Sequence, residues 1–123
     1  MIPPLTIHDV FEGLAAHCTH LKGAAVATPD GLVLASTGAF DGDAPAACAA
    51  GLATSVDNHL SFLTPSRCDD GLVWADSGVW YVARLPNDHL LLVWSGSEEQ
   101  VGLLRLAVQR AVQQLAPMLS TTR

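Results

Sequence analysis

Hydrophobic residues recur every three to four positions in three parts of the chain and form short continuous runs between those parts. The first helical pattern covers residues 5–21, with its apolar positions on one stripe. Thr6 precedes the stripe and Asp9 follows three residues later, a spacing that resembles a capping box. The pattern therefore predicts a first helix over residues 5–21, with Thr6 as its N-cap.

The short apolar runs predict strands. Residues 24–27 and 32–35 flank the sequence Thr-Pro-Asp-Gly. Within it, Pro29 presets φ for a turn and Gly31 can take a positive φ without a Cβ clash. These features predict a tight β-hairpin that begins the sheet. Three further strands are predicted over residues 72–75, 79–85 and 90–94, with hairpin turns at residues 76–78 and 86–88.

A second helical pattern covers residues 44–63 and has two contrasting sides. Asp41 or Asp43 can cap it, and Pro45 suits its first turn. The apolar side carries Cys48, Leu52, Val56, Leu60 and Leu63. The opposite side carries small or polar residues, namely Ala46, Ala47, Ala50, Thr54, Asp57 and Ser61. A solvated helix face usually carries Lys and Glu, so the small side indicates that another backbone approaches closely; the alternative is an exposed face rich in alanine for its helix propensity.

The third helical pattern covers residues 101–118 and follows a Ser-x-x-Gln capping box at residues 97–100. Pro117 is expected to end this helix. Leu103 and Leu106 fall outside its apolar stripe, so they either pack on the first helix or contact a partner.

The predicted order is helix, strand, strand, helix, strand, strand, strand, helix. Tight hairpins favour one five-stranded antiparallel sheet, and three amphipathic helices would cover its two faces. The predicted fold class is therefore α+β, an α/β/α sandwich. Nothing repeats and no low-complexity linker divides the sequence, so residues 1–123 are expected to form a single domain.

Composition restricts the function classes. Half of the 123 residues are hydrophobic and 15% are charged, which favours a compact core over disorder. The net charge is −6 and the six Lys and Arg residues are scattered, which disfavours binding to nucleic acid or to an anionic membrane surface. There is no signal-peptide pattern, and three cysteines without repeating spacing indicate a reducing compartment. We expect a cytoplasmic protein without a cofactor.

Few side chains suggest chemistry of their own. His17, Cys18 and His20 could begin a metal site, but Cys18 faces the apolar stripe while His20 points away. Cys68 precedes two acidic residues, which raise the pKa of a thiol and oppose its use as a nucleophile. His59 falls in the apolar stripe of the second helix and is interpreted as a core or interface histidine. We therefore expect no catalytic and no metal-binding residues.

The chain resembles the Roadblock family, which includes dynein light chains and bacterial gliding-motility regulators of Ras-like GTPases. The resemblance is carried by the order of elements, by GAAVATPDGLVLAS in the first hairpin, by the Ala-rich second helix and by the Ser-capped last helix. It covers residues 5–118. It implies a profilin-like sandwich, no catalytic residues, and homodimers joined through the second helix and the third strand. Family members are partners of small GTPases, and some activate them.

This implication agrees with the small side of the second helix. A strand over residues 72–75 at the sheet edge would also need protection, which pairing with its own copy would provide. The expected interface residues are Ala46, Ala47, Ala50, Thr54, Asp57, Leu72 and Trp74. Arg67 is the one candidate for an arginine that acts on the GTPase in trans, although ordering of the GTPase's own switch segments is the favoured mechanism.

An alternative function is a small-molecule sensor domain with a pocket lined by Trp74, Trp80 and Tyr81. The register of the hairpin at residues 76–78 decides how these aromatic side chains meet. A three-residue loop is expected to place Trp74 opposite Trp80, and a two-residue loop to place it opposite Tyr81. The sequence leaves both registers open.

Overall fold

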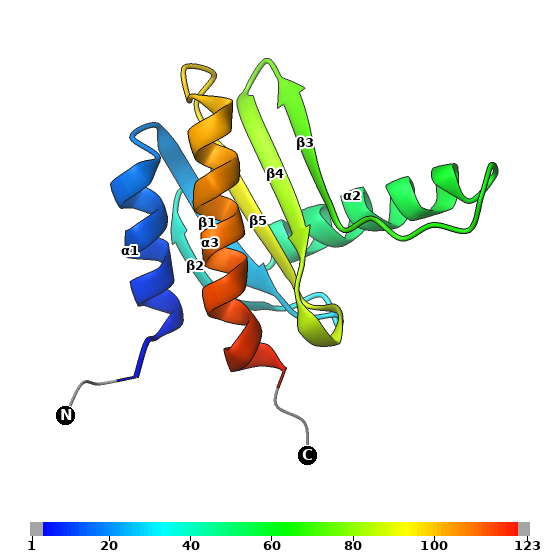
Figure 1. The fold of residues 1–123 in the computed structure, drawn as a ribbon, viewed down its shortest axis with the longest axis horizontal. Helices are drawn as coiled ribbons and strands as arrows, with labels where there is room; N and C mark the ends of the chain where they lie inside the picture. The colour runs from blue at the N-terminus through cyan, green and yellow to red at the C-terminus, as the bar shows by residue number, and fades with distance from the viewer. Residues whose placement is uncertain (1–3, 121–123) are drawn as a thin grey trace.

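A computed structural model describes residues 4–120 and contains three helices around one antiparallel sheet (Figure 1). The elements, in chain order, are α1 (Ile7–His17), β1 (Leu21–Ala27), β2 (Val33–Gly38), α2 (Ala44–Leu60), β3 (Asp70–Ala75), β4 (Gly78–Arg84), the short 3-10 helix η1 (Pro86–Asp88), β5 (Leu90–Ser95) and α3 (Val101–Leu119). The five strands are arranged in the order β2-β1-β5-β4-β3. The predicted α+β sandwich and its order of elements are confirmed.

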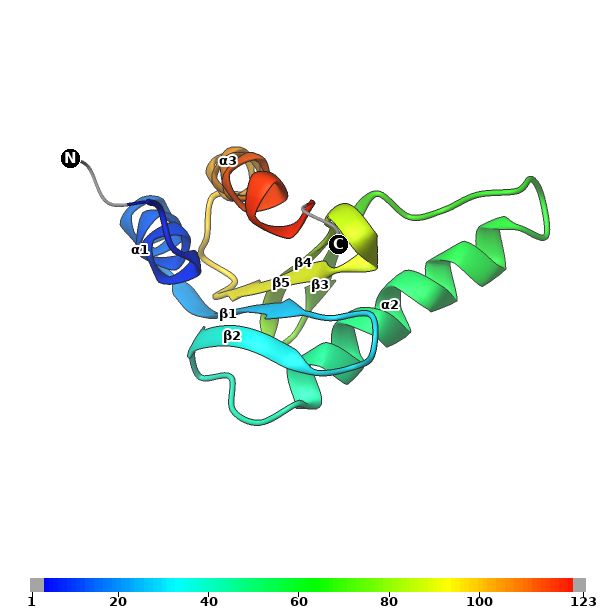
Figure 2. The same ribbon diagram turned by 90° about the horizontal axis from the view of Figure 1, so that it is seen from below.

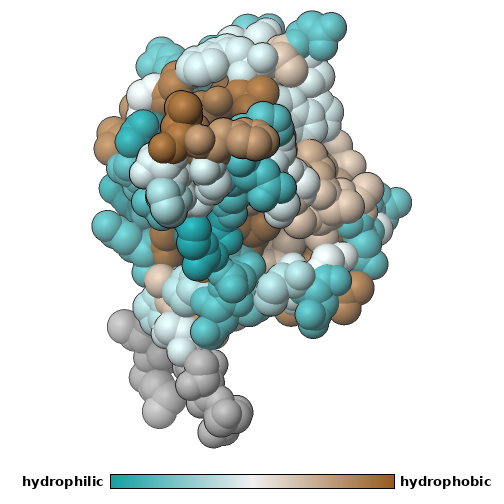
Figure 3. All heavy atoms as spheres, turned by 90° about the vertical axis from the view of Figure 1, so that its right-hand side faces the viewer, coloured by the Kyte–Doolittle hydropathy of each residue, from teal (hydrophilic) through white to brown (hydrophobic). Residues whose placement is uncertain are grey.

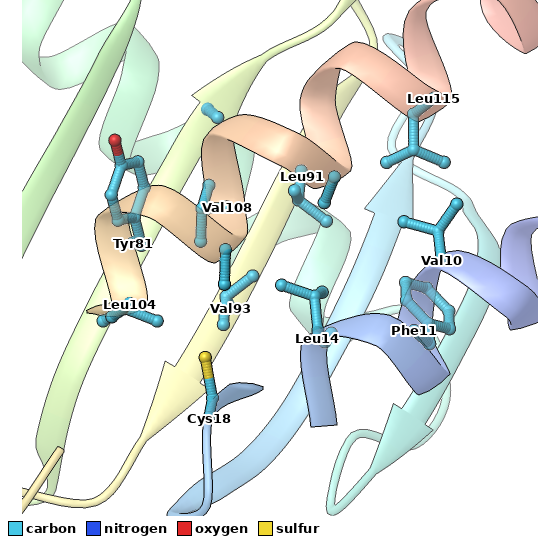
Figure 4. Close-up of a cluster of buried hydrophobic side chains, with 14 of the residues drawn as sticks. Val10, Phe11, Leu14, Cys18, Tyr81, Leu91, Val93, Leu104, Val108 and Leu115 are labelled. Carbon is cyan, nitrogen blue, oxygen red and sulfur yellow. The ribbon is translucent and has the colours of Figure 1, made fainter. Parts of the chain in front are cut away.

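The sheet separates two layers of helices. Figure 2 shows α1 and α3 on one face of the sheet and α2 on the other. The larger core lies between the sheet and the α1/α3 pair, where Leu14, Leu91 and Leu104 are fully buried (Figure 4). Because the hydrophobic stripes of α1 and α3 meet there, this layer follows directly from the sequence periodicity. Within residues 4–120, none of the helices has the length and hydrophobicity that crossing a bilayer requires.

Helix α1 begins as predicted and ends earlier than predicted. The Asp9 N–H donates to Thr6 Oγ1 at 3.1 Å and the Thr6 N–H donates to Asp9 Oδ2 at 2.9 Å, which forms the expected capping box. The helix stops at His17 because Leu21 already belongs to β1, where it pairs with Ser95 of β5. Strand pairing therefore overrides the helical period of the last four predicted residues.

Helix α3 covers the predicted residues, but the two signals that were expected to end it at either side are wrong. The capping box at residues 97–100 does not form, because the Glu99 N–H closes a turn onto the Gly96 carbonyl and the buried Glu99 carboxylate accepts the His20 N–H at 3.1 Å. The helix also continues through Pro117 to Leu119. Proline has no backbone N–H, so Pro117 removes one hydrogen-bond donor from the helix. The carbonyl groups of the last turn can still accept hydrogen bonds from the residues that follow.

The hairpin turns set the sheet register. Gly31 has φ 89° in the first turn, as predicted. In the second hairpin, between β3 and β4, Ala75 pairs with Gly78, so Trp74 lies opposite Val79, and both predicted partners for Trp74 are wrong. The loop holds only two residues because β4 begins directly at Gly78, whose φ of 131° a glycine can adopt.

Candidate interaction surface

One line of small residues on α2 packs against the sheet of the same chain. Ala46, Ala49 and Ala53 are buried there, in a cluster with Ala27 and Leu92 of the central strands. The sequence predicted that another backbone approaches the small side closely, and at Ala46 the approaching backbone belongs to its own sheet. Ala46 is therefore wrong as a partner-facing residue, because its side chain is already covered.

Other small residues of α2 are less covered. Ala47 and Thr54 are exposed, while Ala50 is half-buried at the border of the same cluster. The predicted separation of the two sides thus holds only in part, since the residues that reach the sheet are one position away from those expected. Alanine side chains differ little from one another in hydrophobicity, so periodicity could not locate the sheet-facing line among them.

The C-terminal half of α2 projects beyond the sheet. Ala53 is its last buried residue, and Figures 1 and 2 show the rest of the helix extending past β3. We call residues 54–63 the projecting end. Its exposed apolar side chains are Val56 and Leu60, followed after the helix by Phe62 and Leu63, which are 86% and 88% exposed. Most of the predicted apolar side of α2 therefore has no partner within the described chain.

Strand β3 is an edge of the sheet next to this projecting end. Trp74 is 64% exposed, and Val73 is 41% exposed on the same face as α2. Leu72 instead packs partly onto the α1/α3 core. An outermost strand also leaves every second pair of backbone N–H and C=O groups without a strand partner. Figure 3 views the molecule from this side and shows hydrophobic side chains gathered on it.

Asp57 holds the segment that returns from α2 to β3. Its Oδ1 accepts the Cys68 N–H, and its Oδ2 accepts Arg84 Nη2 at 3.1 Å. Arg84 Nε also donates to the Cys68 carbonyl at 2.9 Å. Asp57 was predicted to lie at the subunit interface, but its carboxylate makes this half-buried ion pair within its own chain.

We expect Asp57→Ala to lower the free energy of unfolding by about 2 kcal/mol, because it leaves the mostly buried Arg84 and the Cys68 N–H without their shared acceptor. Arg67→Ala is the matched control. Its ion pair with Asp88 is more than half exposed and screened by solvent, so its loss should leave stability almost unchanged. Urea unfolding of both variants measures the difference in the free energy of unfolding. Equal losses of stability would contradict the assignment of Asp57 to a stabilising ion pair within its own chain.

Three aromatic rings stack on the α2 face of the sheet. Trp80 and Trp94 lie 4.7 Å apart with nearly parallel planes, and Phe40 lies 6.2 Å and 6.1 Å from them. Lys22 Nζ is 4.9 Å from the Trp94 ring centre. This cluster was not predicted from the sequence. A signal was present, because Trp80 and Trp94 pair across β4 and β5, but Phe40 comes from a loop.

The predicted sensor pocket does not form among the described residues. Tyr81 is buried on the α1/α3 face and donates to Asp70 Oδ2 at 2.7 Å, while Trp80 faces α2. Trp74 is exposed on the edge. Alternation along β4 therefore separates side chains that are neighbours in sequence. A different pocket, open to solvent and with a volume of about 290 Å³, lies beside Trp80. It is lined by Ala39, Phe40, Asp41, Ala44, Pro45, Cys48, Trp80 and Leu92.

The cysteine and histidine side chains considered for a metal site or a nucleophile do not come together in the structure. Burial raises the pKa of the Cys18 thiol to about 11, with a smaller contribution from the Glu99 carboxylate. Burial also raises the pKa of Cys68, followed by Asp57, so the adjacent acids named from the sequence are not its main cause. His59 is exposed and not in the core. Across residues 4–120, no three His, Cys, Asp or Glu side chains are grouped so as to hold a metal ion.

Comparison with solved structures identifies the fold. A Roadblock/LC7 domain from Streptomyces avermitilis is 25% identical, with TM-score 0.81, over 89% of this chain and 94% of that one. The gliding protein MglB from Thermus thermophilus is 20% identical, with TM-score 0.80, over 96% and 98%. An MglB with a tetrameric arrangement is 20% identical, with TM-score 0.81, over 96% and 97%.

A profilin in complex with rabbit actin also matches, at 11% identity and TM-score 0.60, over 94% of this chain and 99% of the profilin. No family sequence profile and no curated protein sequence matches the chain. The structural matches confirm the predicted resemblance to the Roadblock family and the profilin-like α+β fold.

Proposed function

We propose that this chain, which has the Roadblock fold, is a non-enzymatic, cytoplasmic regulator or scaffold that forms a homodimer and binds a Ras-like small GTPase. Residues 1–123 would act as one domain. The observation that carries the proposal is the exposed apolar projecting end of α2 next to the open edge of β3. A contiguous apolar surface of this kind is typical of a protein contact.

A second copy fits this surface by symmetry. Antiparallel pairing of β3 with β3 of the copy requires a twofold axis perpendicular to the sheet, which keeps both α2 helices on the same face. Each projecting end then extends over the sheet of the other copy. The pairing would satisfy the free backbone groups of β3 and bury Val73 and the projecting end together.

The length of the projecting end agrees with this arrangement. From Ala53 to Leu60 the helix advances about 10 Å. Strands in a sheet are about 4.8 Å apart, so this distance spans about two strands of the copy. Val73 on the first of them and Trp80 on the second lie on the α2 face and are incompletely buried, so they provide an apolar surface under the helix. We also assign Ala47, Thr54 and Trp74 to the interface.

The dimer is tested by Leu60→Lys. Placing an ammonium group in the proposed interface should weaken self-association about 30-fold or more, since an unpaired buried charge costs at least about 2 kcal/mol. Leu106→Lys is the matched control, because Leu106 is also an exposed helical leucine but lies on α3. Sedimentation equilibrium gives the dissociation constants. An unmodified chain that stays monomeric at micromolar concentration would overturn the proposal.

The GTPase partner is supported by the resemblance to the Roadblock family. A Ras-like GTPase from the same genome, loaded with GDP or with a non-hydrolysable GTP analogue, should bind the dimer, with preference for one nucleotide state. Single-turnover hydrolysis then distinguishes an activator, which raises the rate, from a scaffold, which leaves it unchanged. Absence of binding to every Ras-like GTPase of that genome would contradict this part of the proposal.

A further inference from the structure

The pocket beside Trp80 is lined mainly by apolar side chains, and no side chain of the described residues fills it. Phe40, Pro45 and Leu92 contribute to it, and Asp41 is its one charged lining residue. The indole N–H of Trp80 donates to Ser77 Oγ at 3.0 Å, and that of Trp94 behind it donates to the Ser77 carbonyl at 3.0 Å. Since both donors are satisfied, the pocket suits an apolar or aromatic side chain that brings no hydrogen-bonding group.

We propose that this pocket receives Phe62 of a second copy of the chain, so that each subunit inserts one phenyl ring into the other. The inference rests on the proposed homodimer and assigns its central contact. Phe62 is 86% exposed, and its aromatic neighbour in its own chain is His59, with ring centres 6.3 Å apart. Burying a phenylalanine removes about 150–250 Å² of surface from water, which makes it an effective anchor.

The position of the pocket agrees with the symmetry. A twofold axis perpendicular to the sheet makes the two α2 helices antiparallel, so the C-terminal end of one lies near the N-terminal end of the other. The pocket lies at the N-terminal end of α2, where Ala44, Pro45 and Cys48 line it. Phe62 follows the C-terminal end. Trp80 also stands on the second strand from the β3 edge, within the distance estimated above for the projecting end.

Cys48 provides a direct test, because this exposed thiol lines the pocket. In Phe62→Cys, the new thiol of one copy should meet Cys48 of the other and form a covalent dimer on mild oxidation. The same bond cannot form within one chain, because Cys48 and the end of α2 are about 18 Å apart along the helix and a disulfide needs Cα atoms within about 7 Å. Non-reducing electrophoresis, at a concentration where sedimentation detects dimers, measures the product.

The matched control is the double variant Cys48→Ser, Phe62→Cys, which should keep the non-covalent dimer and lose the covalent one. A covalent dimer that persists in this control, or a Phe62→Cys dimer that gives none, would overturn the pocket assignment while the homodimer stands. A monomeric unmodified chain would overturn the homodimer itself.

The unmodified chain gives an independent measurement. Phe62 in the pocket should slow alkylation of Cys48 by N-ethylmaleimide about tenfold or more in the dimer, relative to the Leu60→Lys monomer. The two buried thiols, Cys18 and Cys68, provide the slow reference within each sample. Equal Cys48 rates in dimer and monomer would overturn the assignment even if Phe62→Cys failed to dimerise.

Discussion

Gly78→Ala should lower the free energy of unfolding by about 3 kcal/mol. Gly78 begins β4 with φ 131°, a conformation that L-residues rarely adopt and that costs an alanine about 1–3 kcal/mol. A Cβ at this position would also overlap the carbonyl oxygen of Ser95 on β5. That atom belongs to the backbone of β5, where Ser95 pairs with a strand on each side, so it can move only if strand pairing is disturbed.

Gly102→Ala is the matched control for this substitution. Gly102 lies in the first turn of α3, and an added Cβ meets no atom within 4 Å. Alanine is the better helix former, so this variant should be about 0.5 kcal/mol more stable than the unmodified chain. Thermal and urea unfolding of the two variants should therefore shift in opposite directions. A Gly78→Ala variant of unchanged stability would show that the tight two-residue hairpin is wrong.

Ala49→Leu should lower stability by about 1–3 kcal/mol. Ala49 has no exposed surface and lies between α2 and the central strands, where Ala27 and Leu92 leave no room for three more heavy atoms. Overpacking of this kind forces side chains from their preferred rotamers or lifts the helix from the sheet. If α2 moves away from the sheet, Asp57 on α2 also moves away from Arg84 on β4, so we expect their ion pair to weaken.

The control for the α2 assignment is Ala47→Leu, an equal change in volume on the exposed side of the same helix. It should alter stability by less than about 0.5 kcal/mol when measured at concentrations where the chain is monomeric. Equal destabilisation by the two substitutions would mean that α2 does not use the Ala46, Ala49 and Ala53 line against the sheet. Unfolding by urea, followed through tryptophan fluorescence, separates these outcomes.

The candidate surface was partly predictable from the sequence. Trp74 was named as an interface residue, whereas the exposed apolar residues of the second helical pattern were recognised only as its apolar side. Their roles were not all assigned correctly. Leu72 lies partly in the core, and Asp57 makes an ion pair with a residue 27 positions away, which no local pattern reveals. Phe40 was overlooked because it lies in a loop. Phe62 was overlooked because it fell within residues 44–63 but was assigned to neither side of that helical pattern, and the structure ends α2 at Leu60.

By itself, the sequence determined the number, type and order of the elements, the first hairpin turn and the N-cap of α1. These features depend on residues a few positions apart, through hydrogen bonds and periodic burial that local spacing encodes. Only the tertiary structure decided which line of α2 meets the sheet, where α1 and α3 end, and that Trp80 and Tyr81 face opposite layers. The reason is physical, because each of these choices depends on contacts between residues far apart in the chain, such as those of Leu21 with Ser95 and of Glu99 with His20.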